Sequence, residues 1–201
     1  TVIKGYISMI LEGNFGDIET SARGPIEKVY ESNEKLINLV EHLLNISRIE
    51  SGRIQYKMED YDMKGLLRSV IDSLQHEARS KGLDLSFNIP DQEIPPVKID
   101  PPKIRQVVMN LIDNSIKYTY KSKKKRGFVL IRLRYLSEEN KVRLIVEDNG
   151  LGIALEDKIN LFKKFSRGKD ISTVHTEGTG LGLYVAKQII EAHGGEMFAE
   201  S

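Results

Sequence analysis

The sequence has 201 residues, 40% of them hydrophobic and 29% charged, which is the composition of a globular protein of one large or two small domains. It contains no cysteine, and this excludes disulfides, thiol nucleophiles and cysteine-ligated metal centres. Because 30 lysines and arginines are balanced by 29 aspartates and glutamates, the net charge gives no reason to expect a polyanionic partner, and any anion site has to be local.

A heptad pattern occupies the first quarter of the chain. Apolar residues from Ile26 to Leu44 recur at alternating four- and three-residue spacing, which predicts a helix over residues 25–50. Pro25 suits the first turn of this helix, and Ser51 and Gly52 mark its end.

A second helical pattern precedes it. The apolar residues from Val2 to Ile10 repeat at helical spacing, and residues 13–24 have the composition of a connecting loop, so residues 1–52 predict an antiparallel helical hairpin. Two helices with wide apolar faces cannot bury them alone. We therefore expect either a second copy that completes a four-helix bundle or an intramolecular docking surface.

From residue 53 onward, strand and helix periods alternate. The pattern predicts a second domain over residues 53–201, an α+β sandwich in which helices cover one face of a single mixed sheet. The expected strands are 54–58, 83–89, 97–99, 128–135 and 142–147, and the expected helices are 63–78, 103–118, 155–165 and a last one from 182 to the turn at 194–195.

One predicted helix carries polar residues suited to a magnesium-bound nucleotide. Asn110 and Asn114 are four residues apart and Lys117 is three further on, so all three lie on one helix face. This face offers amide oxygens to a hard cation and an ammonium group to phosphate, and a single Asn ligand is enough for Mg²⁺. By itself the same pattern also fits a solvated helix face.

Two glycine-containing segments carry further candidates. Asp148 ends a predicted strand within residues 147–153, where a carboxylate can accept a hydrogen bond from an exocyclic amine such as that of adenine. Residues 178–183 open the last helix, where backbone amides favour phosphate. Taken singly, the first segment also fits an ordinary tight turn and the second a flexible hinge.

The three segments in this order, with Phe162 and Phe165 between the second and the third, resemble the nucleotide-binding boxes of the sensor histidine kinases of bacterial two-component systems. Residues 110–118 look like the N box, 148–152 like the G1 box, 162–165 like the F box and 178–183 like the G2 box. Residues 2–50 look like the dimerisation and phosphotransfer helices of this family. The resemblance covers nearly the whole chain and implies that a GHKL-type ATP-binding sandwich follows the hairpin.

The resemblance also implies the cofactors, ATP and Mg²⁺, and roles for individual residues. Asn114 would bind the metal ion, Asn110 and Lys117 would lie beside the phosphates, and Asp148 would accept the adenine amine. Further residues would line the base pocket, anchor or belong to the lid, or present amides and a second cation to the phosphates: Tyr118, Gly150, Gly152, Ile153, Phe162, Phe165, Arg167, Gly178, Thr179, Gly180, Leu181, Gly182 and Leu183.

The implied activity is transfer of the γ-phosphoryl group of ATP to a histidine on the dimerisation helix, and then to an aspartate of a response-regulator receiver domain. A homodimer and a cytoplasmic location follow from the same resemblance, with membrane attachment only through a sensor region outside this chain. The family's phosphoacceptor histidine belongs upstream of Thr1, and none of His42, His76, His175 and His193 occupies its place. We therefore expect a fragment that contains no catalytic residue and is incomplete at both outer ends.

Two other functions are compatible with parts of the sequence. Related ATPases of the same superfamily use a glutamate four residues before the magnesium-binding Asn, but that position is Asn110, an amide that cannot act as a general base. A catalytically silent dimeric scaffold that only senses nucleotide is the second alternative. Nucleic-acid binding is not expected, because the basic run at 121–126 has no interleaved aromatic residues and fits a solvated loop.

Overall fold

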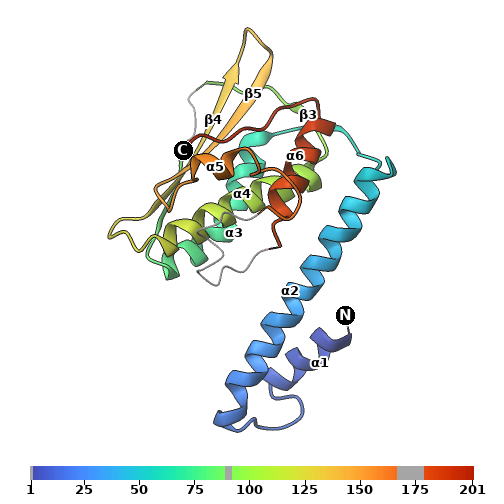
Figure 1. The fold of residues 1–201 in the computed structure, drawn as a ribbon, viewed down its shortest axis with the longest axis vertical. Helices are drawn as coiled ribbons and strands as arrows, with labels where there is room; N and C mark the ends of the chain where they lie inside the picture. The colour runs from blue at the N-terminus through green and yellow to red at the C-terminus, as the bar shows by residue number, and fades with distance from the viewer. Residues whose placement is uncertain (1, 89–91, 167–178) are drawn as a thin grey trace. The chain divides into compact units, whose positions relative to one another are not determined.

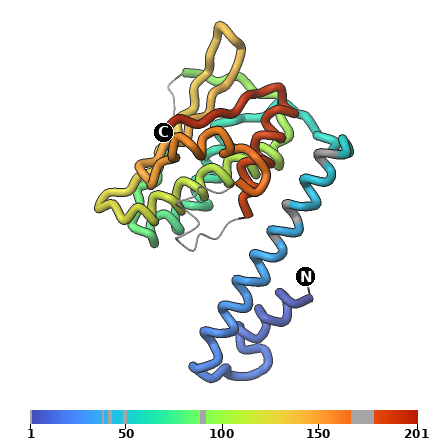
Figure 2. Tube along the Cα trace, viewed as in Figure 1, coloured from blue at the N-terminus to red at the C-terminus, as the bar shows by residue number. Residues whose placement is uncertain are grey.

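The protein is described by a computed structural model that covers residues 2–88, 92–166 and 179–201, without the side chains at positions 38, 41, 42, 49 and 50. The chain forms two compact units, Thr1–Ile54 and Gln55–Ser201 (Figure 1). This division lies two residues beyond the boundary expected after residue 52. Figure 2 follows the chain from one unit into the next.

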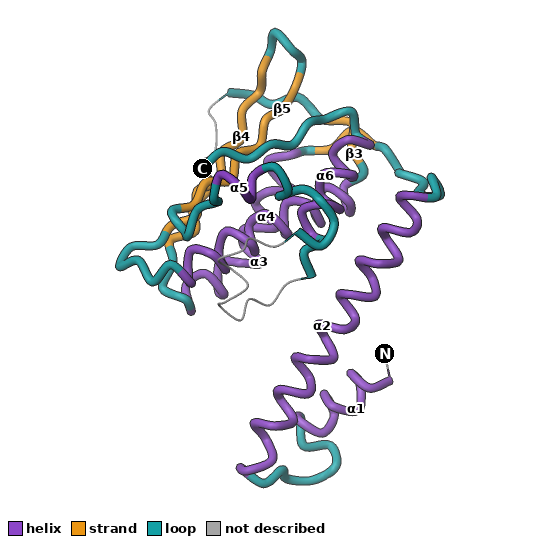
Figure 3. Tube along the Cα trace, in the orientation of Figure 1, coloured by secondary structure: helices purple, strands orange, loops and turns teal. Residues whose placement is uncertain are grey.

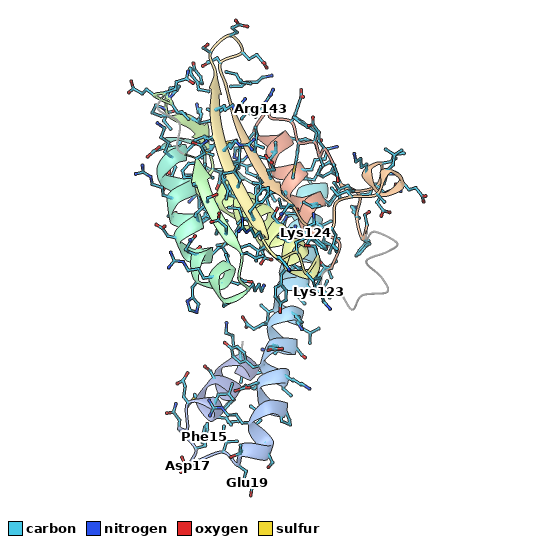
Figure 4. All side chains as sticks on the ribbon, turned by 90° about the vertical axis from the view of Figure 1, so that its left-hand side faces the viewer. Phe15, Asp17, Glu19, Lys123, Lys124 and Arg143 are labelled. Atoms are coloured by element: carbon cyan, nitrogen blue, oxygen red, sulfur yellow. The ribbon has the colours of Figure 1, made fainter. Side chains whose placement is uncertain are left out.

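The first unit is a helical hairpin. Helix α1 (Val2–Leu11) packs against helix α2 (Thr20–Glu50), and an ion pair of 3.0 Å joins Lys4 Nζ to Glu34 Oε1. Phe15, Asp17 and Glu19 lie on the turn between the helices (Figure 4). The hairpin was therefore predicted correctly from the sequence.

Many large apolar side chains of this hairpin face solvent, which is what the width of the apolar pattern predicted. They come from both helices and from the connecting turn: Val2, Ile3, Tyr6, Met9, Phe15, Val29, Leu36, Val40, Leu43 and Leu44.

The start of α2 was predicted wrongly. The helix begins five residues before Pro25, where the carbonyl of Glu19 accepts the backbone N–H groups of Ala22 at 2.9 Å and Arg23 at 3.2 Å. Proline lacks an N–H group, so in this position it removes a single hydrogen bond near the helix start, and a helix of 31 residues tolerates that loss. The expected end is confirmed, because Gly52 adopts a positive φ of 65° directly after the helix.

The second unit contains two sheets among the residues that the structure describes, where one sheet was expected. Strands β1 (Glu59–Tyr61) and β3 (Val97–Ile99) form an antiparallel pair. Strands β2 (Asp84–Asn88), β4 (Phe128–Leu136) and β5 (Lys141–Asp148) form a mixed sheet in the order β2-β4-β5, with β2 parallel and β5 antiparallel to β4 (Figure 3).

The expected strand at 54–58 is wrong, and the chain enters a strand only at Glu59. The backbone N–H of Lys57 donates instead to Asp100 Oδ2 at 2.9 Å, so this segment is held by a side chain rather than by a strand ladder.

Three helices build the core beside the mixed sheet. Helix α3 (Met63–Ser80) packs on β2, helix α4 (Pro101–Lys121) packs on β4, β5 and α3, and helix α6 (Gly182–Ala192) packs on α4. Alternate residues of β4 point into this layer, and Val129, Ile131 and Leu133 are almost completely buried. The opposite sheet face mixes half-buried apolar residues, such as Leu130 and Ile145, with charged ones, such as the exposed Arg143 (Figure 4).

Helix α5 (Leu155–Lys158) is shorter than the helix expected over 155–165. After it the chain continues in tight turns, in which Asn160 N–H donates to the carbonyl of Asp157 at 3.1 Å and Lys163 N–H to that of Asn160 at 2.9 Å. Such three-residue bonds do not extend an α-helix. No helix within the described ranges is long and apolar enough to span a bilayer.

Candidate nucleotide-binding site

The two asparagines of α4 lie together, as their spacing predicted. Asn114 Nδ2 donates to Asn110 Oδ1 over 3.4 Å. The Nδ2 atom of Asn110 is buried, and it has no hydrogen-bond partner among the residues that the structure describes. A buried donor without a partner costs about 1–3 kcal/mol, so this amide is placed to bind an acceptor such as a phosphate oxygen.

The glycine-rich segment before α6 reaches the same asparagine. A Cβ atom on Gly182 would lie 2.3 Å from Asn110 Oδ1, so only glycine allows this approach. Thr179 Oγ1 accepts the backbone N–H of Leu181 at 3.3 Å, and the Leu181 side chain is fully buried. The first turn of α6, with its unpaired amides, therefore begins beside the asparagine pair.

The phenylalanine segment meets the glycine segment. Gly180 has a φ of +69°, and a Cβ atom there would lie 2.8 Å from the backbone carbon of Phe165. Phe165 is itself 62% exposed and has an unusual φ of +58°, whereas Phe162 is half-buried. Leu183 is half-buried on α6. The expected F-box and G2-box residues thus lie next to each other.

Asp148 occupies the end of β5 and is held from two sides. Ser115 Oγ on α4 donates to its Oδ2 at 2.9 Å, and the backbone N–H of Gly150 donates to its Oδ1 at 2.9 Å. The residue remains exposed, so its carboxylate can still accept a hydrogen bond from a ligand. A Cβ atom on Gly150 would lie 2.9 Å from the backbone of Tyr118 and Thr119, which explains the glycine at this position.

Two residues that position this region were missed by sequence reasoning. The first is Ser115, which follows Asn114 on α4 but lies on a different face of the helix, where its hydroxyl meets Asp148. The second is Asn149, whose Oδ1 accepts Phe128 N–H at 2.9 Å and whose Nδ2 donates to the Arg126 carbonyl at 2.9 Å. Only the pairing of β4 and β5 reveals this second role.

Two lysines lie over aromatic rings of the predicted boxes. Lys117 Nζ lies 5.9 Å from the centre of the Tyr118 ring, and Lys187 Nζ lies 5.5 Å from the centre of the Phe162 ring. Desolvation and the neighbouring Glu77 carboxylate raise the pKa of Asp113, and Lys117 opposes that shift. The expected contributions of Arg167 and Gly178 fall outside the described residues.

The remaining predicted residues, Gly152 and Ile153, contact the last residue of the chain. Gly152 has a φ of +74°, and Ile153 N–H donates to Ser201 Oγ at 2.9 Å. Lys158, the last residue of α5, donates from its Nζ to the Ser201 carbonyl at 2.6 Å.

Residues 99–201, just over half of the chain, match the family model described as histidine kinase-, DNA gyrase B-, and HSP90-like ATPase. The chain belongs to this family. It is 29% identical to the circadian input-output histidine kinase CikA of Synechococcus elongatus, over all of this chain and 26% of CikA. The chain thus spans about a quarter of that relative.

Two solved structures share the fold of this family member, and one of them is the histidine kinase ThkA. Full-length ShkA in complex with AMPPNP has a TM-score of 0.76 and 25% identity, over 96% of this chain and 38% of ShkA. ThkA in complex with the response regulator protein TrrA has a TM-score of 0.68 and 25% identity, over 100% of this chain and 53% of the ThkA chain. The resemblance to sensor histidine kinases is therefore confirmed.

Proposed function

We propose that this chain is the kinase core of a two-component sensor, which binds ATP with Mg²⁺ and donates the γ-phosphoryl group to a protein histidine. The observation that carries the proposal is the meeting of Asn110, Asn114 and Gly182, where a buried amide without a partner lies beside the first turn of α6. The names of two relatives, the histidine kinases CikA and ThkA, support the same conclusion.

Each part of the site would hold one part of the nucleotide. Asp148, fixed by Ser115, would accept the adenine amine. The amides at the start of α6, Asn110 and Lys117 would bind the phosphates. Asn114 would hold Mg²⁺, which supplies charge neutralisation at the phosphates when it is bound.

The donor set fits magnesium rather than a metal held entirely by protein. The residues that the structure describes contain no group of three or more His, Cys, Asp or Glu that could hold a metal ion. Mg²⁺ needs few protein ligands, because phosphate oxygens and water complete its octahedron. An amide ligand beside a phosphate site therefore suits this ion.

The site favours phosphoryl transfer to an imported nucleophile over ATP hydrolysis. The side chain at the position of the hydrolytic glutamate is the amide of Asn110, which cannot remove a proton from water. Phosphoryl transfer depends chiefly on positioning and charge stabilisation, and the site supplies both.

The first unit would provide dimerisation and phosphotransfer helices, and the second the catalytic ATP-binding domain. The exposed apolar residues of the hairpin, such as Leu36 and Val40 on α2, would be buried by a second copy in a four-helix bundle. The second phosphoryl transfer would go to a receiver domain that docks on the hairpin, and the protein would act in the cytoplasm, where ATP is available.

The deciding experiment incubates the natural full-length protein with γ-³²P-labelled ATP and Mg²⁺. We expect protein-bound label that is labile in acid and stable in base, as phosphohistidine is, and we expect it to be lost in Asn114→Ala but retained in Asn160→Ala, an exposed asparagine. Rapid release of free phosphate without protein-bound label would support an ATPase, and nucleotide binding with neither product would support a silent scaffold.

A further inference from the structure

Helix α6 lies antiparallel along the first half of α4, and contacts fix it at both ends. At its start, Gly182 packs against Asn110. At its end, His193 Nε2 accepts the backbone N–H of Asp100 at 3.0 Å, beside the end of β3 (Figure 1). The spans 182–193 and 100–110 are about 16.5 Å and about 15 Å long at 1.5 Å per helical residue, so the two contacts together define one register between the helices.

The His193 ring has a fixed orientation because both nitrogens are used. Since Nε2 accepts from Asp100, the ring proton is on Nδ1, which donates to the carbonyl of Ile189 at 2.7 Å. The backbone is equally constrained. Gly194 has a φ of +72°, and Gly195 N–H donates to the carbonyl of Ile190 at 3.0 Å, which is the pattern of a Schellman helix end.

Asp100 connects this contact to the beginning of the unit. The residue is only 6% exposed, and its Oδ1 accepts the N–H of Lys103 at 3.1 Å, which caps α4. Its Oδ2 accepts the N–H of Lys57 at 2.9 Å. The Tyr56 ring meets the His193 ring edge-on at 5.3 Å, and burial together with the Asp100 charge raises the pKa of Tyr56. The chain that enters the unit is thereby tied to the ends of both helices.

We infer that His193 is a positioning residue for the phosphates: by fixing the register of α6 on α4, it holds the amides at the start of α6 over Asn110 and Asn114. A helix of 11 residues behaves as a rigid rod, so a shift at His193 moves Gly182 by a similar amount. The inference rests on the proposed nucleotide site. Adenine recognition can be measured separately, because Asp148 is held by Ser115 of α4 and by Gly150, and neither hydrogen bond involves a residue of α6.

Two substitutions test the roles of the two ring nitrogens of His193 separately. The amide of His193→Asn reaches the place of Nδ1 and cannot reach Asp100, whereas the side-chain oxygen of His193→Gln reaches the place of Nε2 and can still accept its N–H. We expect the dissociation constant for ATP to rise on the order of tenfold in His193→Asn, because without the Asp100 contact α6 can leave its register in the unbound protein and binding has to restore that register. We expect it to stay within about threefold of the wild-type value in His193→Gln, which keeps an acceptor for that donor.

The readout that a merely structural role would not move is the ratio of the dissociation constants of ATP and adenosine. Both are measured on the full chain by competition with a fluorescent ATP analogue, next to thermal unfolding. His193→Asn should raise this ratio and leave adenosine binding unchanged. The same pair of substitutions at His76, an exposed histidine of α3, is the matched control and should change nothing.

Three results for the His193 variants would overturn the inference. Equal weakening of ATP and adenosine, identical behaviour of the Asn and Gln variants, or failure of the Asn variant alone to fold would assign His193 a purely structural role. A folded wild-type chain that binds adenosine but shows no additional affinity for ATP would contradict the proposed function itself, and is recognised before any variant is made.

Discussion

The contact between Gly182 and Asn110 leads to the sharpest prediction, for Gly182→Ala. The added Cβ atom would lie 2.3 Å from Asn110 Oδ1, where ordinary contacts begin at 3.4 Å, so the two atoms overlap by more than 1 Å. The clashing atom ends a short side chain that can rotate. We therefore expect Asn110 to turn away from the phosphates, with a small cost to the fold and a large cost to binding.

The cost to the fold and the cost to binding can be estimated separately. Overpacking costs about 1–3 kcal/mol, and replacing a helical glycine by alanine returns about 0.5–1 kcal/mol, so the free energy of unfolding should fall by no more than about 2.5 kcal/mol. Loss of one charge-assisted hydrogen bond to phosphate is worth about 1.5–3 kcal/mol. The dissociation constant for Mg-ATP should therefore rise on the order of tenfold to a hundredfold.

Isothermal titration with Mg-ATP and urea unfolding measure the two effects. Gly5→Ala on α1, where an added Cβ meets nothing within 4 Å, is the control and should leave binding unchanged. In an Asn110→Ala background, Gly182→Ala should weaken binding no further, because the clashing atom is gone. A large additional loss in that background, or full affinity of the single Gly182→Ala variant, would refute the reasoning.

Three further predictions concern other parts of the molecule. Ser115→Ala should weaken ATP binding by about 1 kcal/mol, because it removes one of the hydrogen bonds that orient Asp148, and should not affect a purine triphosphate that lacks the exocyclic amine. Asp113→Asn should stabilise the protein at neutral pH, because the pKa of the Asp113 carboxyl is raised in the folded protein. The wild-type protein therefore loses stability as the pH rises from about 4 through the pKa of the folded state, and it stays less stable at higher pH. Urea unfolding at pH 3.5 and pH 7 measures this, and the gain should vanish at the lower pH. Val40→Asp on the exposed apolar face of α2 should convert the proposed dimer to a monomer in multi-angle light scattering.

Each of these has a matched control. Ser73→Ala on α3 removes a hydroxyl that donates to the Val70 carbonyl of its own helix, and should leave nucleotide selectivity intact. For Asp113→Asn, an equal gain in the free energy of unfolding at both pH values would contradict the raised pKa of Asp113 as its cause. For the hairpin, an unchanged mass of Val40→Asp, compared with Lys28→Asp on the same helix, would favour an intramolecular docking surface.

The sequence predicted most elements of the second unit because their signals are local. The strand alternation of β4 and the helical spacing of α4 are each set by neighbouring residues, and both elements lie within a few residues of their predicted bounds. The expected strand at 54–58 failed because a distant group decides its structure: the Asp100 carboxylate takes the N–H of Lys57. The start of α2 was predicted wrongly because Pro25 was assigned to the first helical turn, whereas this helix of 31 residues tolerates a proline inside it.

The sequence by itself determined that this chain is a helical hairpin followed by a nucleotide-binding sandwich, because periodicity and the order of short motifs survive without any knowledge of contacts. Only the tertiary structure decided how those motifs meet. The contacts of Gly182 with Asn110, Ser115 with Asp148 and His193 with Asp100 join segments 33 to 93 residues apart. Their register is set by the packing of helices and strands, and no local pattern encodes it.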